Sequence, residues 1–138
     1  MSEWAHCHVD RVRFADLDAM RHLNNAAFLT FFESARVEYI SRLLGDDPTT
    51  RGQFGVIFAE CKIRYRAPAF LDEEIRTCVR PAEIARSSVK LEFAMHSTAD
   101  ERLLADGYGT IVGYDYGAGR ATPLPEPFKA ALGAHLVS

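Results

Sequence analysis

One segment constrains this chain more than any other, because it reads as a long apolar helix with both ends marked. Asn24 and Asn25 can cap a helix start, since their side-chain oxygens accept hydrogen bonds from free backbone N–H groups. Leu44 is followed by Gly45, two aspartates and Pro48, which are residues typical of a helix stop. The segment between these ends predicts a helix of about 19 residues, longer than the usual 11 to 12.

Apolar side chains cover most of the circumference of this predicted helix. One stripe contains Phe28, Phe32, Ala35, Tyr39 and Leu43, and further apolar surface comes from Leu29, Phe31, Val37, Ile40 and Leu44. A helix that is apolar on most sides must be wrapped by other elements. Glu33 and Arg36 lie one turn apart at the margin of this apolar sector, where we expect a local ion pair. A catalytic role for Glu33 is the alternative.

Polar residues gather between an alternating strand-like run, HVDRVRF, and the start of the helix. The intervening stretch, ADLDAMRHLNN, holds two carboxylates, one histidine and two carboxamides. The helix N-terminus would point its N–H groups toward Asp18 and His22, an arrangement that suits a developing negative charge. A carboxylate, an imidazole and N–H donors are sufficient for acyl-group hydrolysis. The alternative is an ordinary loop with two acids, a turn histidine and two helix caps.

The motif F-x-D-x-D-x-x-x-H-x-N-N-x-x-F, followed by a helix with E-x-x-R, resembles the signature of hotdog-fold acyl thioesterases, the branch that contains 4-hydroxybenzoyl-CoA thioesterase and the bacterial acyl-CoA thioesterases. The residues that carry it are Phe14, Asp16, Asp18, His22, Asn24, Asn25, Phe28, Glu33 and Arg36. The similarity extends from Val9 to about Asp115. It implies an enzyme that hydrolyses an acyl-CoA thioester to a free acid and CoA, without a cofactor.

The resemblance also implies roles for individual residues. Asp18 matches the aspartate that acts in the family as general base or nucleophile, with His22 and Asn25 near the reacting centre. The residues expected to bind substrate are Asn24, Phe28, Phe32, Arg86 and Ser87, the last two because Arg86-Ser87-Ser88 resembles the stretch that approaches the CoA phosphates in relatives.

Three positions depart from the family pattern. Arg21 stands where a glycine is frequent, Met20 where the plant acyl-carrier-protein enzymes have an asparagine, and Phe28 where tyrosine is common. The first departure affects how the loop turns, and the other two remove polar groups from the expected site.

The second half of the chain changes to the period of strands. Alternation predicts strands at 56–65, 73–84, 88–97 and 103–114, with Pro81 marking an edge, bulge or break in the second of them. In the first of them, one face would carry Ile57, Ala59, Cys61, Ile63 and Tyr65, and the other Phe58, Glu60, Lys62 and Arg64. Gly107, Gly109 and Gly113 would let a helix or a ligand approach one face of the last strand. An antiparallel sheet that hides one face against a single apolar helix is an α+β fold, and with the motif we expect the hotdog fold, a sheet wrapped around one long central helix.

Size and composition fit one soluble domain spanning residues 1–138, with 48% hydrophobic and 25% charged residues. The net charge of −3 argues against nucleic acid or an anionic membrane surface as a partner. Cys7, Cys61 and Cys78 lack C-x-x-C spacing and are interpreted as reduced thiols in a cytoplasm. His6 and His8 would point away from Cys7 on a strand, so we expect no metal site, and no apolar run is long enough to span a membrane.

The expected partner is an acyl-CoA or an acyl-carrier-protein thioester, and the acyl group itself stays open. Hotdog relatives pair their sheets across a dimer, so we expect a homodimer or homotetramer with a site between subunits. Two alternatives remain: a hotdog hydratase or dehydratase, and a non-catalytic acyl-CoA-binding module. The second would normally bring a DNA-binding segment, which this chain lacks.

Overall fold

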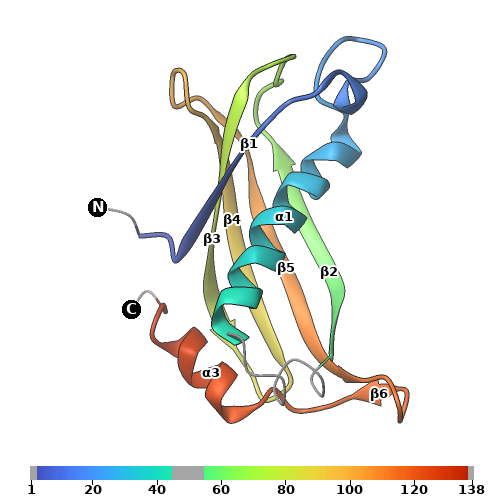
Figure 1. The fold of residues 1–138 in the computed structure, drawn as a ribbon, viewed down its shortest axis with the longest axis vertical. Helices are drawn as coiled ribbons and strands as arrows, with labels where there is room; N and C mark the ends of the chain where they lie inside the picture. The colour runs from blue at the N-terminus through green and yellow to red at the C-terminus, as the bar shows by residue number, and fades with distance from the viewer. Residues whose placement is uncertain (1–2, 45–54, 137–138) are drawn as a thin grey trace.

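The computed structural model describes residues 3–44 and 55–136 and has the predicted α+β architecture. The elements are β1 (His6–Arg11), η1 (Phe14–Asp16), α1 (Asn25–Leu44), β2 (Gly55–Tyr65), β3 (Glu74–Ile84), β4 (Ser88–Ser97), β5 (Leu103–Asp115), β6 (Arg120–Ala121) and α3 (Glu126–Gly133). The long strands form one antiparallel sheet in the order β1-β3-β4-β5-β2, and β6 pairs with β5. α1 lies diagonally across one face of this sheet (Figure 1). This is the hotdog fold.

The boundaries of most elements agree with the sequence predictions. α1 begins at Asn25 and ends at Leu44, while the predicted stop residues from Gly45 to Pro48 lie outside the described residues. The predicted register shift at Pro81 is present, because the pairing of β3 with β4 slips between Pro81 and Glu83. β1 ends at Arg11, earlier than the alternating run suggested.

The core forms where the apolar stripe of α1 meets the inner face of β4 and β5. Phe32 is completely buried and its ring stacks on that of Phe93, with ring centroids 4.1 Å apart. Gly109 lies beneath this pair, and a Cβ added there would come 2.8 Å from a ring atom of Phe32 and 2.4 Å from one of Phe58. Close helix packing is therefore the reason for this glycine. At Gly107 the close neighbour is instead the backbone of Lys62 in β2.

A β-bulge corrects the alternation predicted for β2. The sequence placed Phe58 on the face opposite Cys61, Ile63 and Tyr65. That prediction is wrong, because the register with β5 shifts between Phe58 and Glu60. The extra residue turns Phe58 toward the helix, where its ring packs edge-on against Phe32.

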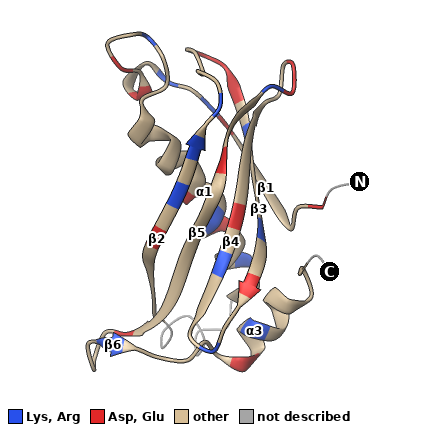
Figure 2. Cartoon of the chain, turned by 180° about the vertical axis from the view of Figure 1, so that it is seen from behind, with Lys and Arg blue, Asp and Glu red and all other residues tan. Residues whose placement is uncertain are grey.

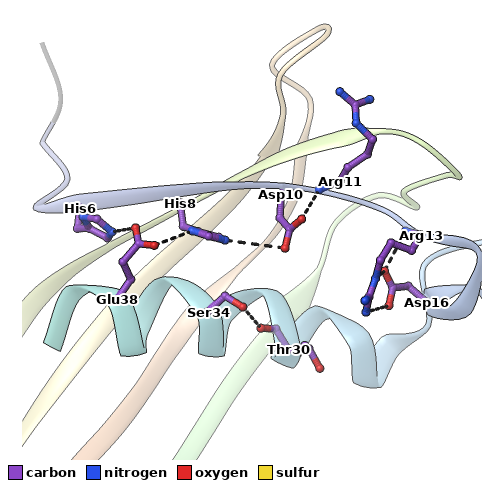
Figure 3. Close-up of polar contacts among 9 residues, drawn as sticks. All are labelled: His6, His8, Asp10, Arg11, Arg13, Asp16, Thr30, Ser34 and Glu38. Carbon is purple, nitrogen blue, oxygen red and sulfur yellow. Dashed lines mark hydrogen bonds and ion pairs between the residues drawn. The ribbon is translucent and has the colours of Figure 1, made fainter. Parts of the chain in front are cut away.

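The expectation of three reduced cysteines is also wrong, because Cys7 and Cys78 form a disulfide between β1 and β3. The two residues are direct partners in the antiparallel register, with their Cα atoms 4.0 Å apart. Cys61 remains a free thiol and is exposed. The histidines beside Cys7 do face the other way, as predicted: His6 and His8 both bond to Glu38 on α1, at 2.6 and 3.2 Å (Figure 3).

The outer face of the sheet carries charges of both signs (Figure 2). Arg80 pairs with Glu92 at 2.9 Å, and Arg64 and Arg66 share Asp106. In the described part of the chain, no helix is long and apolar enough to cross a membrane.

The packing at Gly109 yields a prediction. Gly109→Ala should destabilise the fold by about 1–3 kcal/mol, because its methyl group must displace the rings of Phe32 and Phe58. Thermal or denaturant unfolding measures this loss. Gly133→Ala is the matched control, since an added Cβ there meets nothing within 4 Å, and it should leave the melting temperature unchanged or slightly raised. Equal stability of the two variants would contradict the proposed close packing.

Candidate active site

A cavity of about 300 Å³ opens where the loop before α1 meets the end of β2. Its lining consists of Asp18, His22, Leu23, Asn25, Phe28, Tyr65, Arg66, Ala67 and Pro68. Four of the residues singled out from the sequence are therefore brought together, namely Asp18, His22, Asn25 and Phe28. β2 runs back along α1, so its last residue, Tyr65, and the turn at 66–68 form the opposite wall.

The two oxygens of the Asp18 carboxylate have different surroundings. Oδ1 accepts hydrogen bonds from the backbone N–H groups of Met20 at 2.9 Å and His22 at 3.2 Å. The Asp18 N–H in turn donates to the His22 carbonyl at 2.8 Å, which closes the loop. Oδ2 has no hydrogen bond with any described residue, and the side chain is exposed. One oxygen thus holds the loop while the other is free for chemistry.

Of the two asparagines at the start of α1, Asn24 caps the helix and Asn25 lines the cavity. The Asn24 side-chain oxygen accepts a hydrogen bond from the Ala26 N–H at 2.8 Å. The Asn24 backbone carbonyl accepts from the N–H groups of Ala27 at 2.8 Å and Phe28 at 3.3 Å. The Asn25 N–H has no acceptor among the described residues. It lies at the positive end of the helix dipole, so it is available to a developing oxyanion.

Asp16 is buried and structural, in contrast to the exposed Asp18. Its carboxylate accepts hydrogen bonds from the Arg13 N–H at 2.9 Å and from the Arg13 guanidinium at 3.1 and 3.3 Å (Figure 3). The side-chain hydrogen bond from Arg13 holds the Asp16 pKa below its usual value. The Asp16 carbonyl also accepts from the Asn24 N–H at 2.8 Å, which ties this turn to the helix cap.

Tyr65 and Arg66 line the cavity although they were not predicted as site residues. The Tyr65 hydroxyl donates a hydrogen bond to the Asn25 carbonyl at 3.0 Å, and its ring packs edge-on against Phe28. Burial raises the Tyr65 pKa, so this donor stays protonated. Arg66 is held by Asp106 at 3.2 Å. The sequence R-A-P at the end of the predicted strand indicates a turn at this point. Only the order of the strands in the sheet places that turn beside the start of α1.

Four residues expected to bind substrate do not line this cavity. Phe32 is in the core, and Asn24 caps the helix. Arg86 and Ser87 form the turn between β3 and β4, where their carbonyls accept from Leu124 and Gly113. This turn and the loop before α1, which carries Asp18, lie at opposite ends of the sheet (Figure 1), so a single chain does not bring them together.

The remaining predicted polar residues are placed as follows. His22 is half-buried, and its ring meets Phe70 edge-on, with centroids 5.3 Å apart. Glu33 and Arg36 form the expected ion pair at 3.7 Å. Within the described residues, no group of three or more histidine, cysteine, aspartate or glutamate side chains is arranged to hold a metal ion.

Comparison with known proteins identifies the class to which this hotdog fold and site belong. The family model for the thioesterase-like superfamily matches residues 12–132. The chain belongs to this superfamily, and its enzyme class is thioester hydrolase. No curated protein matches the sequence significantly.

Solved structures share the fold. A thioesterase from Thermus thermophilus, complexed with coenzyme A and Zn, is 32% identical with a TM-score of 0.82, covering 98% of this chain and 96% of its own. A 1,4-dihydroxy-2-naphthoyl-CoA thioesterase from Synechocystis is 18% identical with a TM-score of 0.81, covering 93% and 95%. A Staphylococcus aureus protein in complex with CoA is 12% identical with a TM-score of 0.86, covering 98% and 86%.

The loop geometry explains the unusual position of Arg21 and yields a prediction. Arg21 has a φ of 64°, in the left-handed region where any Cβ is strained, and this accounts for the glycine frequent there in relatives. Arg21→Gly should raise the free energy of unfolding by about 1 kcal/mol. Arg21→Ala removes the same charge but keeps the Cβ, so chemical denaturation should show no gain for it. A gain in both variants would indicate a charge effect and not relief of strain.

Proposed function

We propose that this protein is an acyl-CoA thioesterase that uses Asp18 as its general base or nucleophile. The observation that carries the proposal is the pairing of a free carboxylate oxygen with a free helix N–H group in one cavity. A thioester carbonyl needs both groups, because attack on its carbon places negative charge on its oxygen. The CoA complexes of two structural relatives support CoA as the thiol carrier, and an acyl carrier protein is the other candidate.

The reaction would proceed in two stages around the thioester carbon. The Asn25 N–H stabilises the carbonyl oxygen while Asp18 Oδ2 either removes a proton from an attacking water or attacks the carbon itself. Collapse of the tetrahedral intermediate expels the CoA thiolate. In the nucleophilic route, water then hydrolyses the mixed anhydride and restores the Asp18 carboxylate. His22 and Asn25 would position substrate or water, and Asn24 would act on them through the helix cap.

We further propose that the working enzyme is at least a homodimer, with a homotetramer as a further possible assembly. β2 is an edge strand of 11 residues that exposes Ile57, Phe58 and Tyr65, and its outer edge pairs with no strand among residues 3–44 and 55–136. Such an edge invites pairing with another strand. Antiparallel pairing of two β2 strands would invert the partner, so that the partner's β3–β4 turn would lie at the Asp18 end. This would reconcile Arg86 and Ser87 with a role in binding CoA.

The cytoplasm is the compartment expected from the sequence, because its three cysteines are interpreted as reduced thiols. The bonded pair Cys7 and Cys78 removes this support, because disulfides are rare in reducing compartments.

The role of Asp18 is tested by Asp18→Asn. Asparagine keeps an oxygen for the Met20 and His22 N–H groups but cannot accept a proton or attack, so thiol release from acyl-CoAs should fall by at least about a thousandfold. The melting temperature should change little. Met20→Ala, on the same loop, is the control and should retain turnover. Undiminished turnover in Asp18→Asn would remove Asp18 from the mechanism, whereas tight acyl-CoA binding without any turnover in the wild type would favour a binding module.

The dimer is tested by adding a charge to each edge of the sheet. Light scattering should find the wild type to be at least a dimer, and Ile57→Lys on β2 should shift it toward the monomer and lower activity. Val9→Lys adds the same charge to the opposite edge strand, β1, and should do neither. A monomeric, fully active wild type would contradict the shared site.

A further inference from the structure

Arg36 is a buried cation without an adequate partner. The residue is only 8% exposed, yet Glu33 is its sole ion-pair partner among the described residues, at 3.7 Å and with a side chain 62% exposed. The guanidinium donates no hydrogen bond to any described residue. Its nitrogens are not among the fully buried atoms that lack a partner, so the N–H donors of the guanidinium reach the surface, where an anion can bind them. Burial lowers the Arg36 pKa, and Glu33 offsets this only in part.

Two aromatic rings hold the guanidinium in place. Its central carbon lies 3.9 Å from the centroid of Phe58 and 5.0 Å from that of Phe32. Stacking occupies the faces of the guanidinium and leaves its edges, which carry the N–H groups, for an acceptor in its plane. A carboxylate matches such an edge with two parallel hydrogen bonds.

A second cavity adjoins this fixed cation. It has a volume of about 210 Å³ and is lined by Leu29, Thr30, Glu33, Arg36 and Phe58. Apart from Glu33 on its exposed side, its walls are apolar or weakly polar, so they suit a methylene chain that ends in an anion. Arg36 is the only cationic residue among them.

The second cavity lies along the same α1–β2 seam as the active-site cavity. At the active site the seam is formed by Phe28 and Tyr65, and about one helical turn, ~6 Å, further along it is formed by Phe32 and Phe58. The Arg36 side chain reaches back toward the helix N-terminus to lie over the Phe32 ring, as long helical side chains do. Asn25 precedes Phe32 by seven residues, which is ~10 Å of helix rise. An acyl chain long enough to cover this span along the seam would meet the guanidinium.

We propose that Arg36 selects acyl groups that end in a carboxylate, so that the preferred substrates are CoA thioesters of dicarboxylic acids. The inference rests on the proposed thioesterase function and specifies its substrate class. Hydrolysis is unchanged in either route: the C–S bond breaks, CoA leaves as the thiolate, water supplies the new oxygen of the free acid, and the distal carboxylate stays bound to Arg36 throughout.

The experiment compares matched substrates of equal chain length: adipoyl-, suberoyl- and sebacoyl-CoA against hexanoyl-, octanoyl- and decanoyl-CoA. The wild type should favour a carboxylated member in kcat/KM by about tenfold to a hundredfold, the range for a hydrogen-bonded charge pair. Arg36→Met keeps the length and the apolar stem and should abolish this preference while sparing the uncharged series. Arg36→Lys should restore part of it. Glu33→Gln, which removes a competing carboxylate, should widen it.

Controls separate recognition from a merely structural role. Arg42→Met removes an exposed arginine of the same helix, 4.0 Å from Glu38, and should leave the preference intact. Arg36→Met should keep or raise the melting temperature, since it replaces a largely buried charge, whose pKa burial lowers, with an apolar side chain of similar length. A fall in melting temperature or in oligomeric state, with equal loss on all substrates, would overturn the inference. So would equal wild-type activity on both series, whereas no turnover of any thioester would overturn the proposed function itself.

Discussion

The packing of one apolar helix against the inner face of the sheet determines the rest of this structure. Phe32 stacks on Phe93, and the rings of Phe32 and Phe58 lie so close to Gly109 that a side chain there would displace them. This packing fixes the position of α1 along the sheet and the direction in which the helix crosses it. The N-terminus of α1 is thereby held beside the end of β2, so the cavity at Asp18 is a consequence of core packing and not of the loop alone (Figure 1).

Within the loop, structural and chemical tasks are divided between neighbouring polar residues. Asp16 binds Arg13, and Asn24 satisfies the early N–H groups of the helix. These two residues meet the hydrogen-bonding needs of the backbone. They leave Asp18 Oδ2 and the Asn25 N–H unused, in a place where the helix dipole favours negative charge. Without Asp16 and Asn24, the Asp18 carboxylate and the Asn25 N–H would have to form hydrogen bonds with the backbone of the loop itself.

The sequence predicted those features that depend on local period and composition. The apolar stripe and the two asparagines located α1, and alternation located β4 with its buried residues from Val89 to Met95. It could not predict features set by register between distant segments. The Cys7–Cys78 bond joins residues 71 apart in sequence, and the bulge that turns Phe58 inward becomes visible only against β5. Tyr65 was missed for the same reason, since it joins the cavity through the sheet order.

Three groups on α1, on β2 and in the loop before α1 lack a full set of partners among the described residues. Of the fully buried side-chain polar atoms among the described residues, only Ser97 Oγ lacks a hydrogen-bond partner. The hydrogen bonding of the buried side chains is therefore close to complete. The groups open to a partner are instead accessible ones: the outer edge of β2, the free oxygen of Asp18 and the guanidinium of Arg36, all of which lie along α1 and β2. The outer edge of β1 also pairs with no strand in the described part of the chain, so an open edge alone does not mark the α1–β2 side. What distinguishes this seam is that a free carboxylate oxygen and a guanidinium lie beside an edge strand, so that one partner strand and one substrate could meet all three groups.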